Sequence, residues 1–241
     1  MATLFISDIH LSFSRPFIVD SFLSFLAGPA RKAESLYILG DCFDLYLGDD
    51  DKTHPHPLVV NALRTLTQTT PVFFQRGNHD FLTSDHFSHT SGCEILEDFS
   101  VIKINGKSVL LTHGDLLCTD DTEYQTFRKH TRRPEIQAEF LALSLEQRRI
   151  KANHIRQTSK EKSQLKTSEI MDINQKTVSD IMQKHETQIL IHGHTHRPDI
   201  HHFMVSSKPA VRIVLGDWYE QDSILSWDGD AYSHVRIHDL D

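Results

Sequence analysis

Seven aspartate, histidine and asparagine residues of this sequence have the same local setting, because each closely follows a short apolar run. They are Asp8, His10, Asp41, Asn78, His113, His194 and His196. Any one of them alone is typical of an ordinary turn. Imidazole, carboxylate and amide groups are also ligands of cations such as Mn²⁺, Fe²⁺ and Zn²⁺. Because one cation needs only three or four ligands, the whole set predicts a site for two cations.

Such a pair of cations suits the hydrolysis of phosphate esters. Two metal ions about 3.5–4 Å apart lower the pKa of a shared water and clamp the phosphoryl oxygens for in-line attack. No cysteine belongs to the set, which argues against a structural zinc site or a redox centre.

Strands must position these residues. The apolar runs over residues 2–7, 36–39, 72–76, 107–112 and 188–191 predict buried strands, and ligands of α/β sheets bind at the carboxyl ends of strands. Asp8 and His10 would lie on one side of the extended chain, about 6–7 Å apart. Helices over 18–26 and 57–68, a hairpin around Asn105-Gly106 and later strands over 210–215, 223–227 and 231–237 complete a layered α/β or α+β domain.

Residues 120–185 lack a strand pattern and predict a helical insertion long enough to form a lid. Residues 126–166 carry eleven lysine and arginine residues against four aspartate and glutamate residues, within a chain of net charge −8. We expect this basic stretch to meet a phosphate, a nucleotide or a membrane surface; the alternative is a solvated helix face. Asp49, Asp50 and Asp51 predict a solvated turn rather than a third metal site.

Apolar residues of the insertion lie among its arginines: Phe140, Leu141, Leu143, Leu145 and Ile150. A helical lid of this kind can hold acyl chains while its cations meet phosphates or lipid headgroups. The alternative is that the apolar face packs onto the main domain.

The chain is predicted to act in the cytosol. Its 241 residues contain three cysteines without Cys-x-x-Cys spacing, no run of 18 apolar residues and no signal-peptide pattern at the start. The acidic main domain argues against a nucleic-acid partner, because binding to a phosphate backbone requires a basic stripe.

Five ordered blocks carry a family resemblance: Asp8-x-His10, Gly40-Asp41-x-x-Asp44, Gly77-Asn78-His79-Asp80, His113-Gly-Asp and Gly193-His194-x-His196. Together they resemble the calcineurin-like metallophosphoesterases. The resemblance implies a four-layer αββα sandwich with a dinuclear centre at one edge. It assigns Asp8, His10, Asp41 and His196 to one metal, and Asp41, Asn78, His113 and His194 to the other, with Asp41 bridging; His192 is expected to be structural.

A closer resemblance covers nearly the whole chain. Residues 26–33, 37–41, 48–51, 113–121, 170–175 and 191–198 are similar to the UDP-2,3-diacylglucosamine hydrolase family of lipid A biosynthesis. That family uses manganese, is peripheral on the inner membrane, and releases UMP and 2,3-diacylglucosamine 1-phosphate (lipid X). The resemblance implies two Mn²⁺ per chain, a lipid-linked UDP-sugar substrate, a place on the cytoplasmic face of the inner membrane, and no obligate protein partner. It implies a core of residues 1–120 and 186–241, with 121–185 as a substrate lid.

Substrate contacts of the family fall on seven positions: Asn78, His79, Asp121, Ser159, Ser163, Lys166 and His194. The chain departs from the family at three places. His79 stands where the family usually has arginine, Asp44 where it usually has glutamate, and Ser163 where it tends to have asparagine.

His79 and Asp44 together resemble a catalytic acid dyad of the broader superfamily, in which the aspartate keeps a histidine charged beside the leaving oxygen. The dyad favours an alternative function, a soluble phosphodiesterase or nucleotide hydrolase. A third reading is a non-catalytic scaffold of the same fold, which the intact set of ligands disfavours.

Overall fold

The fold is built on two β-sheets, and the computed structural model describes residues 1–167 and 170–240 except the side chains of Ser163, Leu165 and His238. The first sheet has the order β11-β10-β1-β2-β3-β4. Its strands are β1 (Thr3–Ile6), β2 (Ser35–Leu39), β3 (Val72–Gln75), β4 (Glu94–Leu96), β10 (Ser223–Asp228) and β11 (Ala231–Arg236). The second sheet has the order β5-β6-β7-β9-β8. Its strands are β5 (Ser100–Ile104), β6 (Lys107–Thr112), β7 (Ile189–His192), β8 (Asp199–Val205) and β9 (Lys208–Val214).

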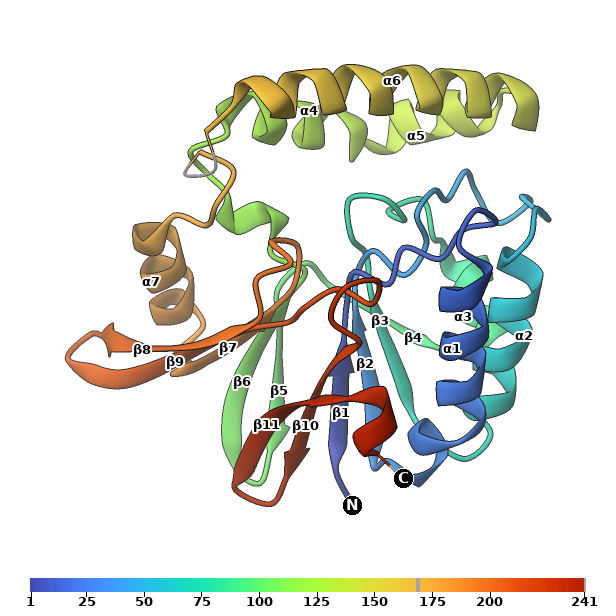
Figure 1. The fold of residues 1–241 in the computed structure, drawn as a ribbon. Helices are drawn as coiled ribbons and strands as arrows, with labels where there is room; N and C mark the ends of the chain where they lie inside the picture. The colour runs from blue at the N-terminus through green and yellow to red at the C-terminus, as the bar shows by residue number, and fades with distance from the viewer. Residues whose placement is uncertain (168–169, 241) are drawn as a thin grey trace.

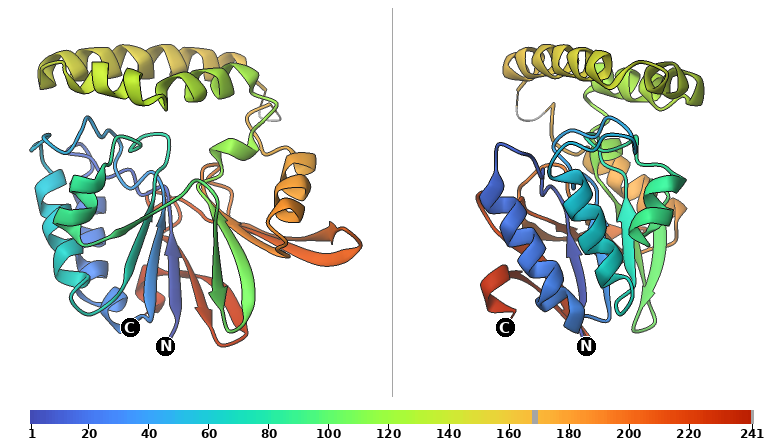
Figure 2. Two further views of the ribbon diagram at one scale, coloured as in Figure 1. Left: turned by 180° about the vertical axis from the view of Figure 1, so that it is seen from behind. Right: turned by 90° about the vertical axis from the view of Figure 1, so that its right-hand side faces the viewer.

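Alternation of side chains along the strands produces the layers. Leu4 and Ile6 of β1 pack in the cluster shared with the helices α1 (Pro16–Ala27), α2 (His56–Leu66) and α3 (Asp85–Ser91), whereas Phe5 packs in the cluster between the two sheets. Leu110 of β6 faces outward, toward Val178 and Met182 of α7 (Gln175–Lys184). Helices therefore cover the outer face of each sheet (Figures 1 and 2), and the predicted αββα sandwich is confirmed.

The helices α4 (Thr122–Thr131), α5 (Pro134–Leu141) and α6 (Leu145–Leu165) form a separate layer over the loops at one end of the sandwich (Figures 1 and 2). We call this layer the cap. The α7 helix, which belongs to the same predicted insertion, packs on the second sheet instead. Its side chains Val178 and Met182 are fully buried, whereas α5 has no buried residue. Amphipathic packing thus divides the range 121–185 into a cap and an outer helix.

The remaining local predictions are confirmed with two omissions. The hairpin of β5 and β6 turns at Asn105 and Gly106, both with positive φ, as a type I′ turn requires. The strands β4 and β8 were not predicted, because each is a half-exposed edge strand without a continuous apolar run. Three short 3₁₀ turns, Pro29–Lys32, Asp115–Leu117 and Ile237–Asp239, complete the described chain.

Arginines of α6 bind the acidic loop 49–51, so the prediction of a solvated turn was wrong. Arg148 donates to both carboxylate oxygens of Asp50, at 2.7 and 2.5 Å, and to the carbonyl of Leu47 at 2.6 Å. Arg149 lies 3.6 Å from the carboxylate of Asp51. Opposite charges from distant parts of the chain therefore hold the cap on the main domain, and part of the basic stretch is neutralised within the molecule.

In the described parts of the chain, every helix is too short or too polar to cross a membrane.

Candidate dinuclear metal centre

The seven predicted ligands gather where the two sheets meet. Asp8 and His10 follow β1, Asp41 follows β2 and Asn78 follows β3; these three strands are parallel neighbours in the first sheet. His113 follows β6, and His194 follows β7, its parallel neighbour in the second sheet. Because all five strands end at the same edge of the sandwich, they bring together residues up to 188 positions apart.

Five of the seven ligands have positive φ angles, a conformation that non-glycine residues rarely adopt. They are Asp8 (54°), His10 (49°), Asp41 (53°), His194 (70°) and His196 (55°). Each costs about 1–2 kcal/mol relative to the right-handed region. Backbone hydrogen bonds hold two of them: Asp8 donates to the Gly40 carbonyl at 3.1 Å, and His10 to the Asp41 carbonyl at 2.9 Å. Strain of this kind collects at functional sites.

Asp41 occupies the middle of the cluster, as expected of a bridging ligand. Its Oδ2 atom lies 3.6 Å from Nε2 of His113, 3.8 Å from Nε2 of His10 and 4.0 Å from Nε2 of His79. Its other oxygen accepts the backbone N–H of His79 at 2.8 Å. The loop after β3 can approach this closely only because residue 77 is glycine, since a Cβ there would collide with the Asp41 side chain.

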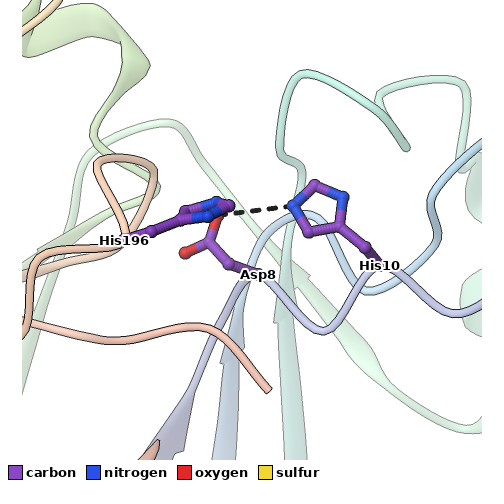
Figure 3. A group of neighbouring side chains, drawn as sticks. All are labelled: Asp8, His10 and His196. Carbon is purple, nitrogen blue, oxygen red and sulfur yellow. Dashed lines mark hydrogen bonds and ion pairs between the residues drawn. The ribbon is translucent and has the colours of Figure 1, made fainter. Parts of the chain in front are cut away.

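Asp8 lies between His10 and His196 (Figure 3). Its Oδ1 atom accepts a hydrogen bond from Nε2 of His196 at 3.1 Å and is 4.0 Å from Nε2 of His10. Its Oδ2 atom accepts the Ser7 hydroxyl at 2.6 Å and the backbone N–H of His194 at 2.9 Å. These two donors fix the carboxylate, which leaves Oδ1 directed at the imidazoles.

His113 and Asn78 form the other side of the cluster. Nδ1 of His113 donates to the Leu39 carbonyl at 2.8 Å, so that Nε2 is directed at the Asn78 side-chain oxygen, 3.0 Å away. In the neutral ring both of these atoms are acceptors. The ring of His194 lies against that of His113, with 5.1 Å between the centroids.

The donor set fits two divalent cations. Nε2 of His10 is buried and has no hydrogen-bond partner, although the atom faces the Asp41 carboxylate. The neutral form of His113 would place two acceptors, its Nε2 atom and the Asn78 side-chain oxygen, next to each other, and a bound cation would then satisfy both. Among the described residues, three groups have ligand atoms within 4.8 Å of one another: Asp8, His10 and His196; His10, Asp41 and His79; Asp8, Asp41 and His113. Shared members join these groups into one site.

Electrostatics favour cations in this site. Burial alone would raise the pKa of Asp8, but the hydrogen bond from His196 and the charge of His113 outweigh it and lower the pKa. Burial would lower the pKa of His113, yet the nearby carboxylates of Asp41 and Asp8 raise it to about 9. The carboxylates thus stay ionised and recruit positive charge, which metal ions can supply in place of protons.

His79 contacts Asp44 differently from the expected dyad. Its Nδ1 atom lies 2.8 Å from the backbone carbonyl of Asp44, not from the carboxylate. Arg156 of α6 donates to both carboxylate oxygens of Asp44 at 3.0 Å and so draws the carboxylate toward the cap. The structure therefore corrects the predicted carboxylate–imidazole contact, while Nε2 of His79 still faces the centre.

The other predicted substrate residues lie in the cap. Lys166 donates to both oxygens of Asp121, at 2.7 and 2.8 Å, and Asp121 also caps the first turn of α4 through the Tyr124 N–H. Ser159 is exposed on α6. The side chain of Ser163 lies outside the described residues.

Two aspartates that support the ligands were not assigned roles from sequence. Asp80 accepts the backbone N–H of Gly77 at 2.8 Å and that of Cys42 at 2.7 Å, and so joins the loops after β2 and β3. Burial and the charge of Asp41 raise the pKa of Asp80 to about 6. Asp217 lies 3.8 Å from Nδ1 of His196. It follows an apolar run and a glycine, as Asp41 does, and this signal could have identified it.

His192 is buried among second-sheet contacts rather than in the cluster. Its Nδ1 atom bonds the Gly193 carbonyl at 2.8 Å, and Nε2 lies 3.1 Å from the guanidinium of Arg212. Burial lowers the pKa of His192 to about 3, so the ring stays neutral and shapes the loop that carries His194.

Comparison with known proteins gives a consistent picture. The calcineurin-like phosphoesterase family matches residues 1–198. Proteins named UDP-2,3-diacylglucosamine hydrolase from Escherichia coli O127:H6 (strain E2348/69 / EPEC) and from E. coli strain K12 / DH10B are each 45% identical over 238 residues, which cover 98% of this chain and 99% of theirs.

Solved structures resemble the fold. Yfce, a phosphoesterase from E. coli, is 20% identical with a TM-score of 0.51, and the match covers 100% of this chain and 96% of that one. An archaeal phosphodiesterase is 12% identical with a TM-score of 0.50, covering 98% and 99%. At such identities the likeness concerns the fold alone.

Proposed function

The chain belongs to the calcineurin-like phosphoesterase family, and from this premise we propose that it hydrolyses the pyrophosphate of UDP-2,3-diacylglucosamine to UMP and 2,3-diacylglucosamine 1-phosphate. The observation that carries the proposal is 45% identity, over almost the full length of both chains, to proteins named for that reaction. The overlapping groups of ligand atoms that share Asp8, His10 and Asp41 support the metal-dependent hydrolysis that this reaction requires.

We infer that the centre takes two Mn²⁺ ions. Asp8, His10, Asp41 and His196 would hold one, and Asp41, Asn78, His113 and His194 the other. Bound ions of this kind supply an activated water and neutralise phosphoryl oxygens. The buried, unpartnered Nε2 of His10 and the closeness of Nε2 of His113 to the Asn78 side-chain oxygen support this assignment.

His79 is assigned to charge stabilisation. The Asp44 carbonyl accepts from Nδ1 of His79 and so orients Nε2 toward the centre. In the imidazolium form both ring nitrogens are donors, and Nε2–H would then donate to a phosphoryl oxygen as charge develops there. The leaving group of the reaction is a phosphate monoester, which is a weak base and does not require a strong acid.

The cap is assigned to the acylated sugar and to the membrane surface. Lys166 and Asp121 are polar groups suited to the sugar and its phosphate. Phe140 packs against the main domain, which favours the packing alternative for that residue, but Ile150 of α6 is 64% exposed. Exposed apolar and basic residues of the cap support peripheral binding to the cytoplasmic face of the inner membrane.

The direct test is product formation. Protein loaded with Mn²⁺ should release UMP from UDP-2,3-diacylglucosamine in mixed micelles, and chromatography measures the UMP. Absence of UMP, together with cleavage of bis(p-nitrophenyl) phosphate, would instead support the alternative of a soluble phosphodiesterase, which His79 favours. Dependence on detergent and co-sedimentation with anionic vesicles separate the two, because a water-soluble substrate needs neither.

A further inference from the structure

A cavity adjoins the candidate metal centre. Its volume is about 270 Å³, and its lining includes Phe13, Asp44, His54, Arg149 and Arg156. The Asp44 carboxylate belongs to both sites, because one of its oxygens lies 3.9 Å from Nδ1 of His10. A ligand whose phosphate is held at the metal centre can therefore extend directly into this cavity, which we call the Phe13 pocket.

The charges in the Phe13 pocket are already paired. Arg156 binds the Asp44 carboxylate, and Arg149 donates to the Thr53 hydroxyl at 2.8 Å. Arg149 also lies 3.6 Å from the carboxylate of Asp51. A balanced set of this kind does not require a second anionic group. It offers hydrogen bonds to a neutral polar ligand.

An aromatic ring stands open at the rim of the pocket. The Phe13 side chain is 74% exposed, and its ring is perpendicular to that of His54 with 6.0 Å between the centroids. An exposed phenylalanine beside hydrogen-bonding groups suits a planar heterocycle, because every nucleobase has a face that can stack. The pocket is also smaller than the roughly 300–1,000 Å³ typical of drug-sized ligands, so it does not suit two acyl chains.

The Phe13 pocket and Lys166, one of the predicted substrate contacts, lie toward different ends of α6. Lys166, paired with Asp121, comes directly after the helix, whereas Arg156 lies ten residues earlier. At a rise of 1.5 Å per residue this separates the two by roughly 15 Å along the helix axis. A pyrophosphate substrate held at the metal centre would then have one half in the Phe13 pocket and the other half near Lys166.

We propose that the Phe13 pocket binds the nucleoside half of the substrate. The base stacks on Phe13, the Asp44 carboxylate and Arg149 bond the ribose hydroxyls and the base edge, and the acylated sugar lies on the Lys166 side. The assignment to uridine rests on the proposed function, but the pocket itself makes a separate prediction: the chain binds a nucleoside monophosphate more tightly than a base-free sugar phosphate.

Calorimetric titration of the Mn²⁺-loaded protein tests this without catalysis. UMP should bind at least about tenfold more tightly than ribose 5-phosphate, which has the phosphate and ribose but no base. Phe13→Ala should weaken UMP binding by about tenfold and leave ribose 5-phosphate binding unchanged, and Phe13→Trp should preserve UMP binding. Phe17→Ala is the matched control, because Phe17 is 75% exposed on α1 and does not line the pocket.

Equal affinity for UMP and ribose 5-phosphate in the unaltered protein would overturn the proposal, as would equal effects of Phe13→Ala and Phe17→Ala. Weaker binding of 2,3-diacylglucosamine 1-phosphate, but not of UMP, in Phe13→Ala would assign the pocket to an acyl chain instead. Failure of the proposed function is distinguishable: UMP would bind as expected while UDP-2,3-diacylglucosamine stays intact.

Discussion

Asp41 is the residue that both halves of the proposed metal centre would share. Its Oδ2 atom lies within 4.0 Å of His10, His79 and His113, and the side chain is almost fully buried. A carboxylate in this position can neutralise two cations at once.

Asp41→Ala is expected to reduce turnover by more than about a hundredfold, because loss of a shared ligand should exceed the 10–100-fold effects of outer partners. Mass spectrometry of the metal content should show fewer than two Mn²⁺ per chain. Asp20→Ala, at an exposed position of α1, is the control and should leave both quantities unchanged. Full activity in Asp41→Ala would contradict the bridging assignment.

His79 tests whether the site needs a cation or a proton donor. We expect His79→Ala to lower kcat by about a hundredfold, at the lower end of effects of positioned donors, with normal metal content. His79→Arg should recover most of this loss. The imidazole ring contacts the backbone carbonyl of Asp44 rather than its carboxylate, so we expect catalysis to need only a positive charge at position 79. If arginine is no better than alanine, proton transfer by His79 is required instead.

At the scale of elements, the cap and the acidic loop form one unit. The sequence predicts a basic helix that binds an external anion, and it predicts separately a solvated acidic turn. In the structure, however, Arg148 of α6 binds Asp50 of the loop. The Arg148 side chain is almost completely buried and also bonds the carbonyls of Leu47 and Leu143. Arg148 therefore connects the start of α6 and the loop before it to the main domain.

Arg148→Met should destabilise the protein by about 1–3 kcal/mol, because it leaves buried carbonyl groups without donors. Chemical denaturation measures the change, and hydrogen exchange should accelerate in residues 47–53 and at the start of α6. Lys151→Met, on the same helix but exposed, serves as the control with an effect within about 0.5 kcal/mol. Unchanged exchange in Arg148→Met would mean that other contacts hold the cap.

At the scale of the whole molecule, folding and metal binding are expected to be separable. Three apolar clusters, one between the sheets and one on each outer face, form the core without any ligand. The metal centre lies at the edge of these layers and stores strain in five positive-φ residues.

Removal of metal with EDTA should abolish activity, and the circular dichroism spectrum should remain that of a folded protein. The thermal midpoint should fall, because ions that bind only the folded state stabilise it by mass action. Addition of Mn²⁺ should restore both the activity and the thermal midpoint. Unfolding on chelation would show instead that the cations are structural, as in small zinc domains.

Much of this protein could be predicted from local pattern alone. Apolar runs predict the buried strands, Asn105-Gly106 predicts a turn, and strand ends predict the ligand set, because each signal depends only on neighbours in sequence. The parallel neighbours β1 and β2 then end at a common edge, so the closeness of Asp8 and Asp41 follows from that order, whereas His113 joins them only because the second sheet packs on the first.

Tertiary structure decided the contacts between residues far apart. Arg148 and Asp50 are 98 positions apart, and Arg156 and Asp44 are 112 apart, so no spacing rule could pair them. Arg156 binds the Asp44 carboxylate and lines the Phe13 pocket, and Arg148 binds Asp50 of the acidic loop. The α7 helix joined the sandwich for a similar reason: an apolar face packs on whichever surface the folded chain leaves uncovered, and that surface exists only once the second sheet has formed.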